Sequence, residues 1–220
     1  MLETASPEIK AESKREMKKI LLFVFLTTMC FGQVPRPYIA GGLSLMPAGY
    51  ASAAYRVQGG LYTNAPHIVS DVYGAYDNGR KDNDNTAGNT NGHDRYLAGF
   101  VAYKFGNTFT GAGARWSQLS TTNYTKSATH YQFGIGHDWA VARGQVFYIL
   151  PAGTSGIQGP EFSVILPSPV SRRHLFVRFE TGIYEYHDTV TDPSNSELTA
   201  VQTGNRHATA STTMMLMYRF

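Results

Sequence analysis

Histidine stands close in sequence to a serine or a carboxylate in several places, and these are the residue types of a hydrolytic site. The three candidates are His93 with Asp94, His187 with Asp188, and His207 with Ser211. The third pair is four residues apart, so on one extended strand its side chains share a face but are too distant for a direct hydrogen bond. The other two pairs adjoin polar loops, where such residues are common without any catalytic role. We therefore predict no catalytic residue.

Oxygen-rich residues between 78 and 94 suggest a calcium loop, with Asp82 and Asp84 as the first candidate ligands. Counted from Asp82, the sixth position is not glycine and the twelfth is not glutamate, so the EF-hand spacing fails. The seven histidines include no pair spaced one, three or four residues apart, which removes the usual zinc patterns. The sequence thus predicts a solvated loop, with no metal and no cofactor.

β-strands are the elements that would position these residues, because apolar and polar residues alternate along several segments of the chain. In the final segment Met214, Leu216, Tyr218 and Phe220 share one face, while polar residues and methionines share the other. In 174–186 the apolar face includes Phe179, and the opposite face carries Arg178 and Glu180. A soluble sandwich shows the same alternation, so the pattern alone does not distinguish a membrane from a protein core.

The connections between predicted strands provide that distinction. We predict strands at about 37–46, 52–63, 67–77, 95–105, 108–118, 129–139, 145–150, 161–167, 174–187 and 208–220. Connections after the second, fourth, sixth and eighth strands are short, whereas those after the third, fifth and ninth are long and polar. This sorting is typical of a bacterial barrel. We predict an all-β, transmembrane, antiparallel up-and-down barrel of ten strands. Eight is the alternative count, with the first or seventh strand the one to omit.

The amino-terminal region is typical of an export signal. An apolar run from Ile20 to Phe31 follows Met17-Lys18-Lys19 and ends near Gly32, which is too short for a membrane-spanning helix. We interpret 1–16 as a mis-called upstream extension, 17–32 as the signal peptide and 33–220 as the barrel domain, with the mature chain starting near Gln33. Cys30 is the only cysteine, and a lipid-attachment role for it is the less favoured alternative because the large Met29 precedes it.

The end of the chain resembles the C-terminal signature of outer-membrane barrels, which closes on an aromatic residue preceded by apolar residues at alternate positions. The matching residues are Met214, Leu216, Tyr218 and Phe220. The resemblance implies that the barrel-assembly machinery reads this strand. From about Ala51 to Phe220 the chain is also similar to small proteins grouped as an outer membrane protein β-barrel domain family. That resemblance implies a location in the bacterial outer membrane but no activity.

If the apolar faces contact lipid, the charged residues that alternate with them point into the barrel. These are Arg56, Asp71, Lys104, Arg115, Asp138, Glu161, Arg178 and Glu180. Both signs are equally represented, and a barrel of eight to ten strands is about narrow enough to be filled by side chains. We expect a closed interior crossed by salt bridges. Glycines such as Gly134, Gly136 and Gly182 are expected to make room for the long charged side chains.

Aromatic residues are expected to form two rings at the two membrane interfaces. Tyr103, Phe105, Trp139 and Tyr218 fall near the short connections, and Tyr76, Trp116, Tyr131 and Tyr184 fall near the long ones.

The predicted function is structural, adhesive or surface-protective, acting through the outer loops. A narrow porin-like channel for small solutes is the alternative, and an outer-membrane lipid-modifying enzyme is less favoured. Expected partners are outer-membrane lipid, lipopolysaccharide and the assembly machinery, while the extracellular ligand stays open. The formal net charge is only +3 and the basic residues are scattered, so nucleic-acid binding is not predicted.

Overall fold

The computed structural model is an all-β barrel, and it describes residues 35–45, 53–81, 90–121, 125–153, 156–171, 173–187 and 207–220. The predicted extension and signal peptide, residues 82–89 of the oxygen-rich segment, and Asp188 lie outside these ranges, whereas residues 78–81 and 90–94 of that segment belong to strands and not to the predicted loop. The strands are β1 (Arg36–Leu45), β2 (Ala53–Asn64), β3 (Ile68–Lys81), β4 (Thr90–Phe105), β5 (Thr108–Thr121), β6 (Thr125–Trp139), β7 (Ala142–Pro151), β8 (Gly156–Pro167), β9 (Leu175–His187) and β10 (His207–Arg219).

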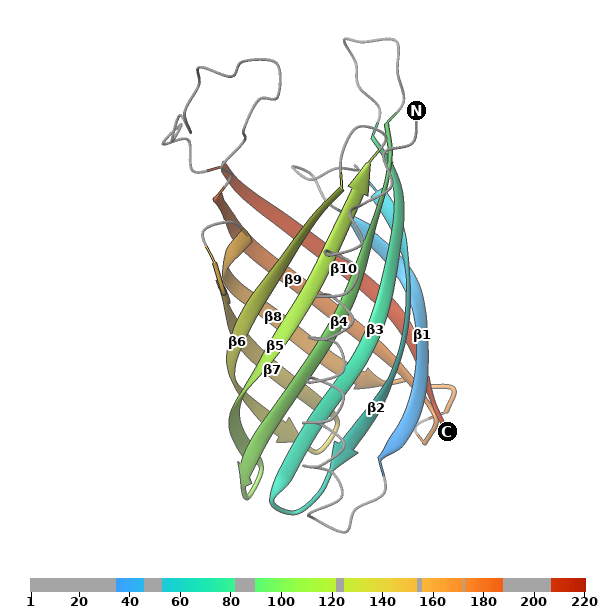
Figure 1. The fold of residues 1–220 in the computed structure, drawn as a ribbon. Coiled ribbons are helices and arrows are strands. Elements are labelled where there is room, and N and C mark those ends of the chain that lie inside the picture. Colours follow the sequence, from blue (N-terminus) through green and yellow to red (C-terminus); the bar gives the residue numbers. More distant parts are fainter. Residues whose placement is uncertain are drawn as a thin grey trace, which may run out of the picture.

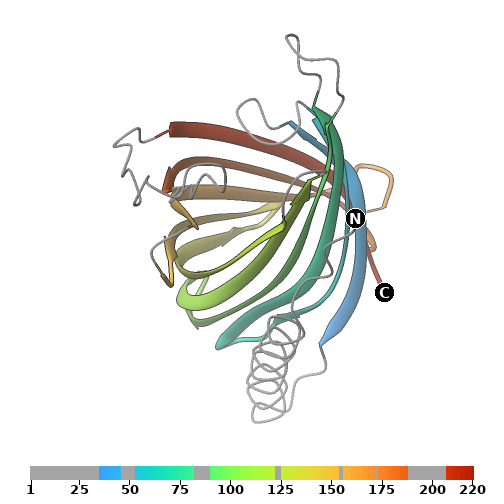
Figure 2. The same ribbon diagram turned by 45° about the horizontal axis from the view of Figure 1, so that its top comes forward.

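Each strand pairs antiparallel with its neighbour in sequence, and β10 pairs with β1 to close the barrel. The closing register sets Tyr38 opposite Arg219 and Leu45 opposite Thr212. Figures 1 and 2 show the strands tilted around a single lumen. Closure satisfies backbone hydrogen bonds at what would otherwise be two sheet edges. The prediction of ten strands is therefore confirmed, and β1 and β7 are both present.

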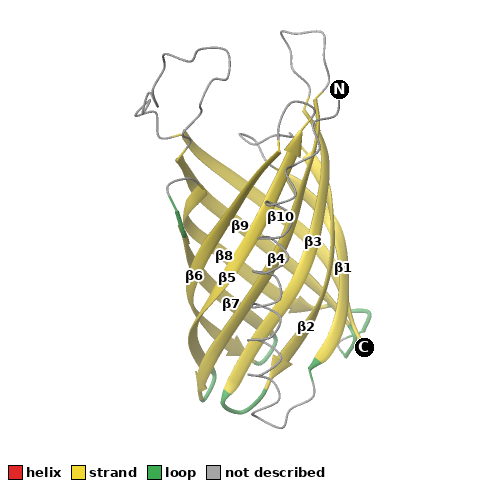
Figure 3. Ribbon diagram, viewed as in Figure 1, coloured by secondary structure: helices red, strands yellow, loops and turns green. Residues whose placement is uncertain are grey.

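The barrel has two different ends, which we call the short-turn end and the loop end. Connections 65–67, 106–107, 140–141 and 168–174 lie at the short-turn end, at the bottom of Figure 3, together with the carboxyl terminus. The predicted sorting of connections by length is only partly right. β5 ends at Thr121 and β6 begins at Thr125. The connection between them, predicted to be long, is therefore shorter than connection 168–174 at the short-turn end.

The alternating residues of the strands produce an apolar outer wall. Ile39, Leu43, Phe133, Ile135 and Leu216 are all exposed, and other large apolar side chains are exposed along β2 and β7 to β10. The residues between them are buried, as in β7, where buried positions alternate with exposed or partly exposed ones. A soluble protein would bury such side chains. Among the described residues, no helix is both long enough and apolar enough to cross a membrane.

An apolar cluster fills part of the lumen. Its members are Tyr38, Ala40, Tyr62, Val69, Phe100, Ala102, Phe109, Phe147, Ile165, Met215 and Met217. Several stand close to the short-turn ends of their strands, including Val69 in β3, Phe109 in β5 and Met217 in β10. Phe100 and Phe147 meet edge to face with ring centroids 5.0 Å apart. The cluster gives this barrel a packed core inside the sheet as well as an apolar surface outside it.

Candidate functional site

The lumen is the candidate site, because the structure places all eight charged residues singled out from the sequence on its inner face. Arg56, Asp71, Arg115, Glu161, Arg178 and Glu180 are buried there. Lys104 and Asp138 are partly buried near the short-turn end and form an ion pair with 2.6 Å between Nζ and Oδ2. Side chains at alternate positions of a strand face the same side of the sheet, and here that side is the lumen.

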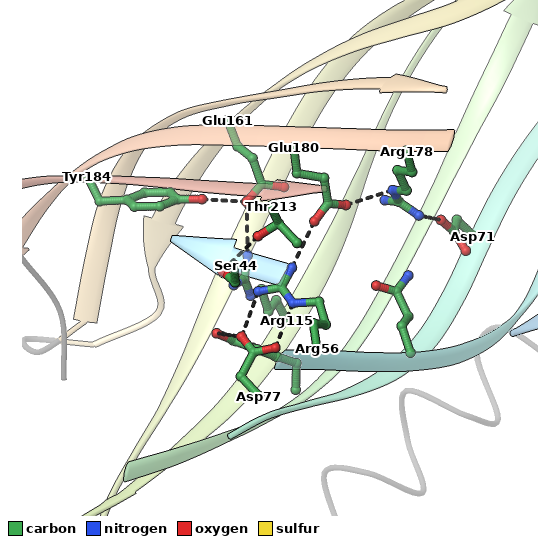
Figure 4. Close-up of polar contacts among 12 residues, drawn as sticks. Ser44, Arg56, Asp71, Asp77, Arg115, Glu161, Arg178, Glu180, Tyr184 and Thr213 are labelled. Carbon is green, nitrogen blue, oxygen red and sulfur yellow. Dashed lines mark hydrogen bonds and ion pairs between the residues drawn. The ribbon is translucent and has the colours of Figure 1, made fainter. Parts of the chain in front are cut away.

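Arg56 is the most connected side chain of the network. Its Nε and Nη2 donate to the two oxygens of Asp77 at 2.7 and 2.8 Å, and its Nη1 donates to Oε2 of Glu180 at 2.9 Å (Figure 4). Tyr96 donates its hydroxyl to Asp77 at 3.1 Å. Asp77 has no exposed surface, so its charge depends on these partners.

Arg178 extends the network toward the opposite wall. It lies between Glu180, with Nε 2.7 Å from Oε1, and Asp71, with Nη1 3.1 Å from Oδ2 (Figure 4). Asp71 also accepts a hydrogen bond from the hydroxyl of Tyr38 at 2.9 Å. Tyr38 in turn accepts one from Nε2 of Gln58 at 2.8 Å. Because the ring of Tyr38 belongs to the apolar cluster, the polar and apolar fillings of the lumen meet at this residue.

A second group joins Arg115 to Glu161, with Nη1 3.1 Å from Oε2. Tyr184 donates its hydroxyl to the same oxygen at 2.6 Å. Tyr184 is 6% exposed, so its prediction as a member of the outer aromatic ring is wrong. The alternation that turned Arg178 and Glu180 inward also turns Tyr184 inward, so the signal was present in the sequence.

Three of these ion pairs cross the lumen, whereas Arg56 and Asp77 stand opposite each other on the neighbouring strands β2 and β3. In the circular strand order, β1 and β10 separate Arg56 on β2 from Glu180 on β9. Likewise, β6 and β7 separate Arg115 on β5 from Glu161 on β8. Side chains that meet from non-adjacent strands occupy the space through which a solute would pass. The arrangement ties the walls together and obstructs the lumen.

Gly134, Gly136 and Gly182 make room for aromatic rings rather than for charged side chains. A Cβ on Gly136 would lie 2.2 Å from the ring of Phe109, and one on Gly182 would lie 2.2 Å from the ring of Tyr184. The prediction that these glycines make room for long charged side chains is therefore wrong. Alternation shows that small residues point inward, but it does not identify which side chains lie next to them.

Sequence reasoning missed four charged residues of the interior: Asp77, Asp94, Arg143 and Arg219. Asp77 is fully buried, and Arg143 is 6% exposed. Asp94 and Arg143 lie beyond the predicted strand ends at 95 and 145, whereas β4 and β7 begin at Thr90 and Ala142. Extending the period of two by one or two residues would have found both.

The catalytic candidates do not assemble into a described site. His93 packs against the exposed Tyr76 with centroids 5.7 Å apart, whereas the next residue, Asp94, has an oxygen buried without a hydrogen-bond partner. Consecutive strand residues face opposite sides, so these two cannot act together. The side chains of His187 and His207 lie outside the described set. Across the described ranges, no group of three or more His, Cys, Asp or Glu could hold a metal ion.

The C-terminal signature residues lie on the outer wall of β10 and just beyond it. Met214, Leu216, Tyr218 and Phe220 are all exposed. Tyr218 stacks on His174 and contacts Phe220 edge to face, with centroids 5.9 and 5.1 Å apart. Tyr103, Phe105 and Trp139 are also exposed close to the short-turn end, and Tyr76 and Tyr131 are exposed nearer the loop end. Both sets have the placement of interfacial aromatic residues.

Comparison with known proteins found no matching family model and no matching curated protein. Three solved structures are similar in outline. The anion-selective porin from Comamonas acidovorans is 10% identical with a TM-score of 0.37, over 77% of this chain and 50% of the porin. The siderophore receptor PirA from Pseudomonas aeruginosa is 15% identical with a TM-score of 0.31, over 70% of this chain and 30% of the receptor. This chain therefore spans half or less of those two proteins.

The third structure is Ail, the attachment invasion locus protein of Yersinia pestis, in complex with the heparin analogue sucrose octasulfate. It is 12% identical with a TM-score of 0.32, over 86% of this chain and 100% of Ail. All three identities and TM-scores are low, so these structures indicate no function for this chain.

Proposed function

We propose that the chain is a bacterial outer-membrane barrel whose closed interior makes it a rigid support for its outer loops, with a structural, adhesive or surface-protective role. The observation that carries the proposal is the combination of an apolar outer wall with a lumen filled by ion pairs and an apolar cluster. Only lipid or a large apolar partner makes such a wall favourable. A closed barrel is also one of the two folds that satisfy every backbone group within lipid.

The filled lumen favours support over transport. An ion entering it would have to displace Arg56 or Arg115 from their carboxylates and then pass Phe100 and Phe147. Each displaced arginine would leave a buried carboxylate without its partner, at a cost of about 3–5 kcal/mol. Those costs oppose steady conduction and leave the loop end as the surface available for recognition.

We therefore expect no steady conductance from purified protein reconstituted in a planar lipid bilayer. The physical reason is that neither the ion-pair network nor the apolar cluster leaves a continuous polar path. A porin preparation under the same conditions is the positive control, and Phe100→Ala combined with Phe147→Ala is a variant with a widened lumen. Regular open-channel steps from the unmodified protein would instead support the narrow-channel alternative.

The outer wall is tested separately, by lysine at Phe179. This side chain is 40% exposed and stands opposite Val164 and Met214 on the neighbouring strands, both exposed. Lysine on the lipid face near mid-membrane costs roughly 2–4 kcal/mol. We expect Phe179→Lys to reduce insertion into lipid vesicles, while Phe179→Leu inserts normally. Equal insertion of both variants would show that this wall does not contact lipid.

The proposed role of the loops is tested by binding. Immobilised protein would be presented with host matrix proteins and with lipopolysaccharide, and a version with residues 188–206 replaced by a short flexible linker would be the control. An adhesive role requires binding that the shortened protein loses. Binding unaffected by shortening this or any other outer connection would remove the support for that role.

A further inference from the structure

Basic side chains gather at the short-turn end of the lumen, apart from the cross-lumen network. Arg36 and Arg219 lie at the start of β1 and the end of β10, Lys104 lies beside the end of β4, and Arg143 lies beside the start of β7. We call these four residues the basic mouth. Among the described residues, Asp138 is the only carboxylate within ion-pair distance of any of them.

Both oxygens of Asp138 already accept hydrogen bonds from members of the basic mouth. One of its oxygens, Oδ2, lies 2.6 Å from Nζ of Lys104 and 2.7 Å from Nη2 of Arg143, and Nε of Arg143 donates to Oδ1. Lys104 completes its contacts with Oδ1 of Asn64 at 3.0 Å. One negative charge therefore serves two cations, so Lys104 and Arg143 together keep an excess positive charge.

Arg219 has no carboxylate partner in the described part of the chain. Its guanidinium carbon lies 4.4 Å from the ring centroid of Tyr62 and 4.1 Å from that of Phe176. Arg143 approaches the same tyrosine, at 5.1 Å, so one ring holds both guanidinium groups close together. Nε of Arg219 and Nη1 of Arg143 are buried without a hydrogen-bond partner among the described residues.

This arrangement differs from that of the network above it. There, Arg56, Arg115 and Arg178 each contact at least one carboxylate, and no cation is left over. At the mouth, like charges are held together in a partly desolvated place, which is unfavourable until an anion is added. A guanidinium presents paired donors that match the oxygens of phosphate or carboxylate groups.

We propose that the basic mouth binds a small oxyanion of the phosphate or carboxylate class, with Arg219 as the principal ligand and Arg143, Lys104 and Arg36 supplying further positive charge. The anion enters from the aqueous side of the short-turn end, where Arg36 is exposed and Arg219 is partly exposed. The inference depends on the closed barrel alone and not on the role of the outer loops.

The test is isothermal titration of the folded protein in a non-ionic detergent with inorganic phosphate, and separately with acetate, at constant ionic strength. Saturable binding in the millimolar range or tighter is expected for phosphate. The thermal unfolding midpoint should also rise with phosphate more than with chloride of the same ionic strength, because a ligand of the native state stabilises it. Absence of both effects would overturn the proposal.

Variants then locate the site. Arg219→Gln is expected to weaken phosphate binding about tenfold, the loss of one charge-assisted hydrogen bond. Arg173→Gln, at an exposed arginine in the same end's 168–174 connection, is the matched control and should bind as the wild type does. If Arg219→Gln does not fold, Arg219→Lys keeps the charge but not the paired donors and should weaken binding by a smaller factor. Equal losses at Arg219 and Arg173, or none at Arg219, would contradict the assignment.

Discussion

Arg56→Met is expected to lower the free energy of unfolding by about 3–5 kcal/mol, which is a large fraction of the stability of a small domain. The change removes both hydrogen bonds to Asp77 and the one to Glu180. Asp77 would then be a fully buried carboxylate supported only by the hydroxyl of Tyr96. The measurement is urea unfolding in phospholipid vesicles, followed by tryptophan fluorescence.

Two further variants distinguish the effect of charge from that of packing. Arg95→Met changes an exposed arginine on β4 and should alter stability by no more than about 0.5 kcal/mol. Arg56→Met combined with Asp77→Asn removes the buried pair as a unit, and it should recover much of the loss because no uncompensated carboxylate remains. A double variant as unstable as Arg56→Met would indicate that the arginine acts mainly by filling space.

The cross-lumen network also explains how a narrow barrel can use polar residues as its core. Inward positions face one another across a small distance, so Arg56, Arg115 and Arg178 each contact a carboxylate on a non-adjacent strand. Buried pairs of this kind add little net stability compared with apolar packing, but breaking one is costly. This favours a single arrangement of the ten strands, since a register shift would separate several pairs at once.

The sequence was sufficient to predict the barrel, the strand count and the direction of most side chains. All three depend on local information, namely the alternation of apolar and polar residues along each strand and the polar residues that mark the strand ends. Phe179 and Arg178 lie on opposite faces as the alternation indicates, and Phe179 is exposed while Arg178 is buried. The same rule, applied consistently, would also have turned Tyr184 inward.

The partners within the lumen could not be predicted in the same way. That Arg56 meets Glu180 and Arg178 meets Asp71 depends on strand tilt and on the stagger between strands, which are properties of the closed barrel and not of any single strand. The apolar cluster was missed for a related reason. Met215 and Met217 alternate with lipid-facing residues and look like ordinary inward positions until Phe100 and Phe147 are known to stand across from them.

Phe220→Asp, or deletion of Phe220, is expected to remove most of the folded barrel from the outer membrane and leave degraded or aggregated chain. The physical basis is closure, because β10 must pair with β1, and an unpaired edge within lipid leaves backbone groups unsatisfied at several kcal/mol each. Phe220 stands at the end of this seam, where its backbone N–H donates to the carbonyl of Pro37 at 3.1 Å and its ring contacts Tyr218. The resemblance to barrel C-terminal signatures implies in addition that the assembly machinery reads this strand.

The measurement is migration on a gel before and after boiling, since folded barrels change mobility when they are boiled. Phe220→Trp keeps a terminal aromatic ring and should assemble normally. Phe105→Asp is the control for apolarity, because Phe105 is 61% exposed at the same end and Phe220 is 66% exposed. If only the terminal residue matters for assembly, Phe105→Asp retains most of the folded form while Phe220→Asp loses it. Equal amounts of folded protein in the two aspartate variants would mean that Phe220 contributes through apolarity alone, and normal assembly of the deletion variant would contradict the terminal signal altogether.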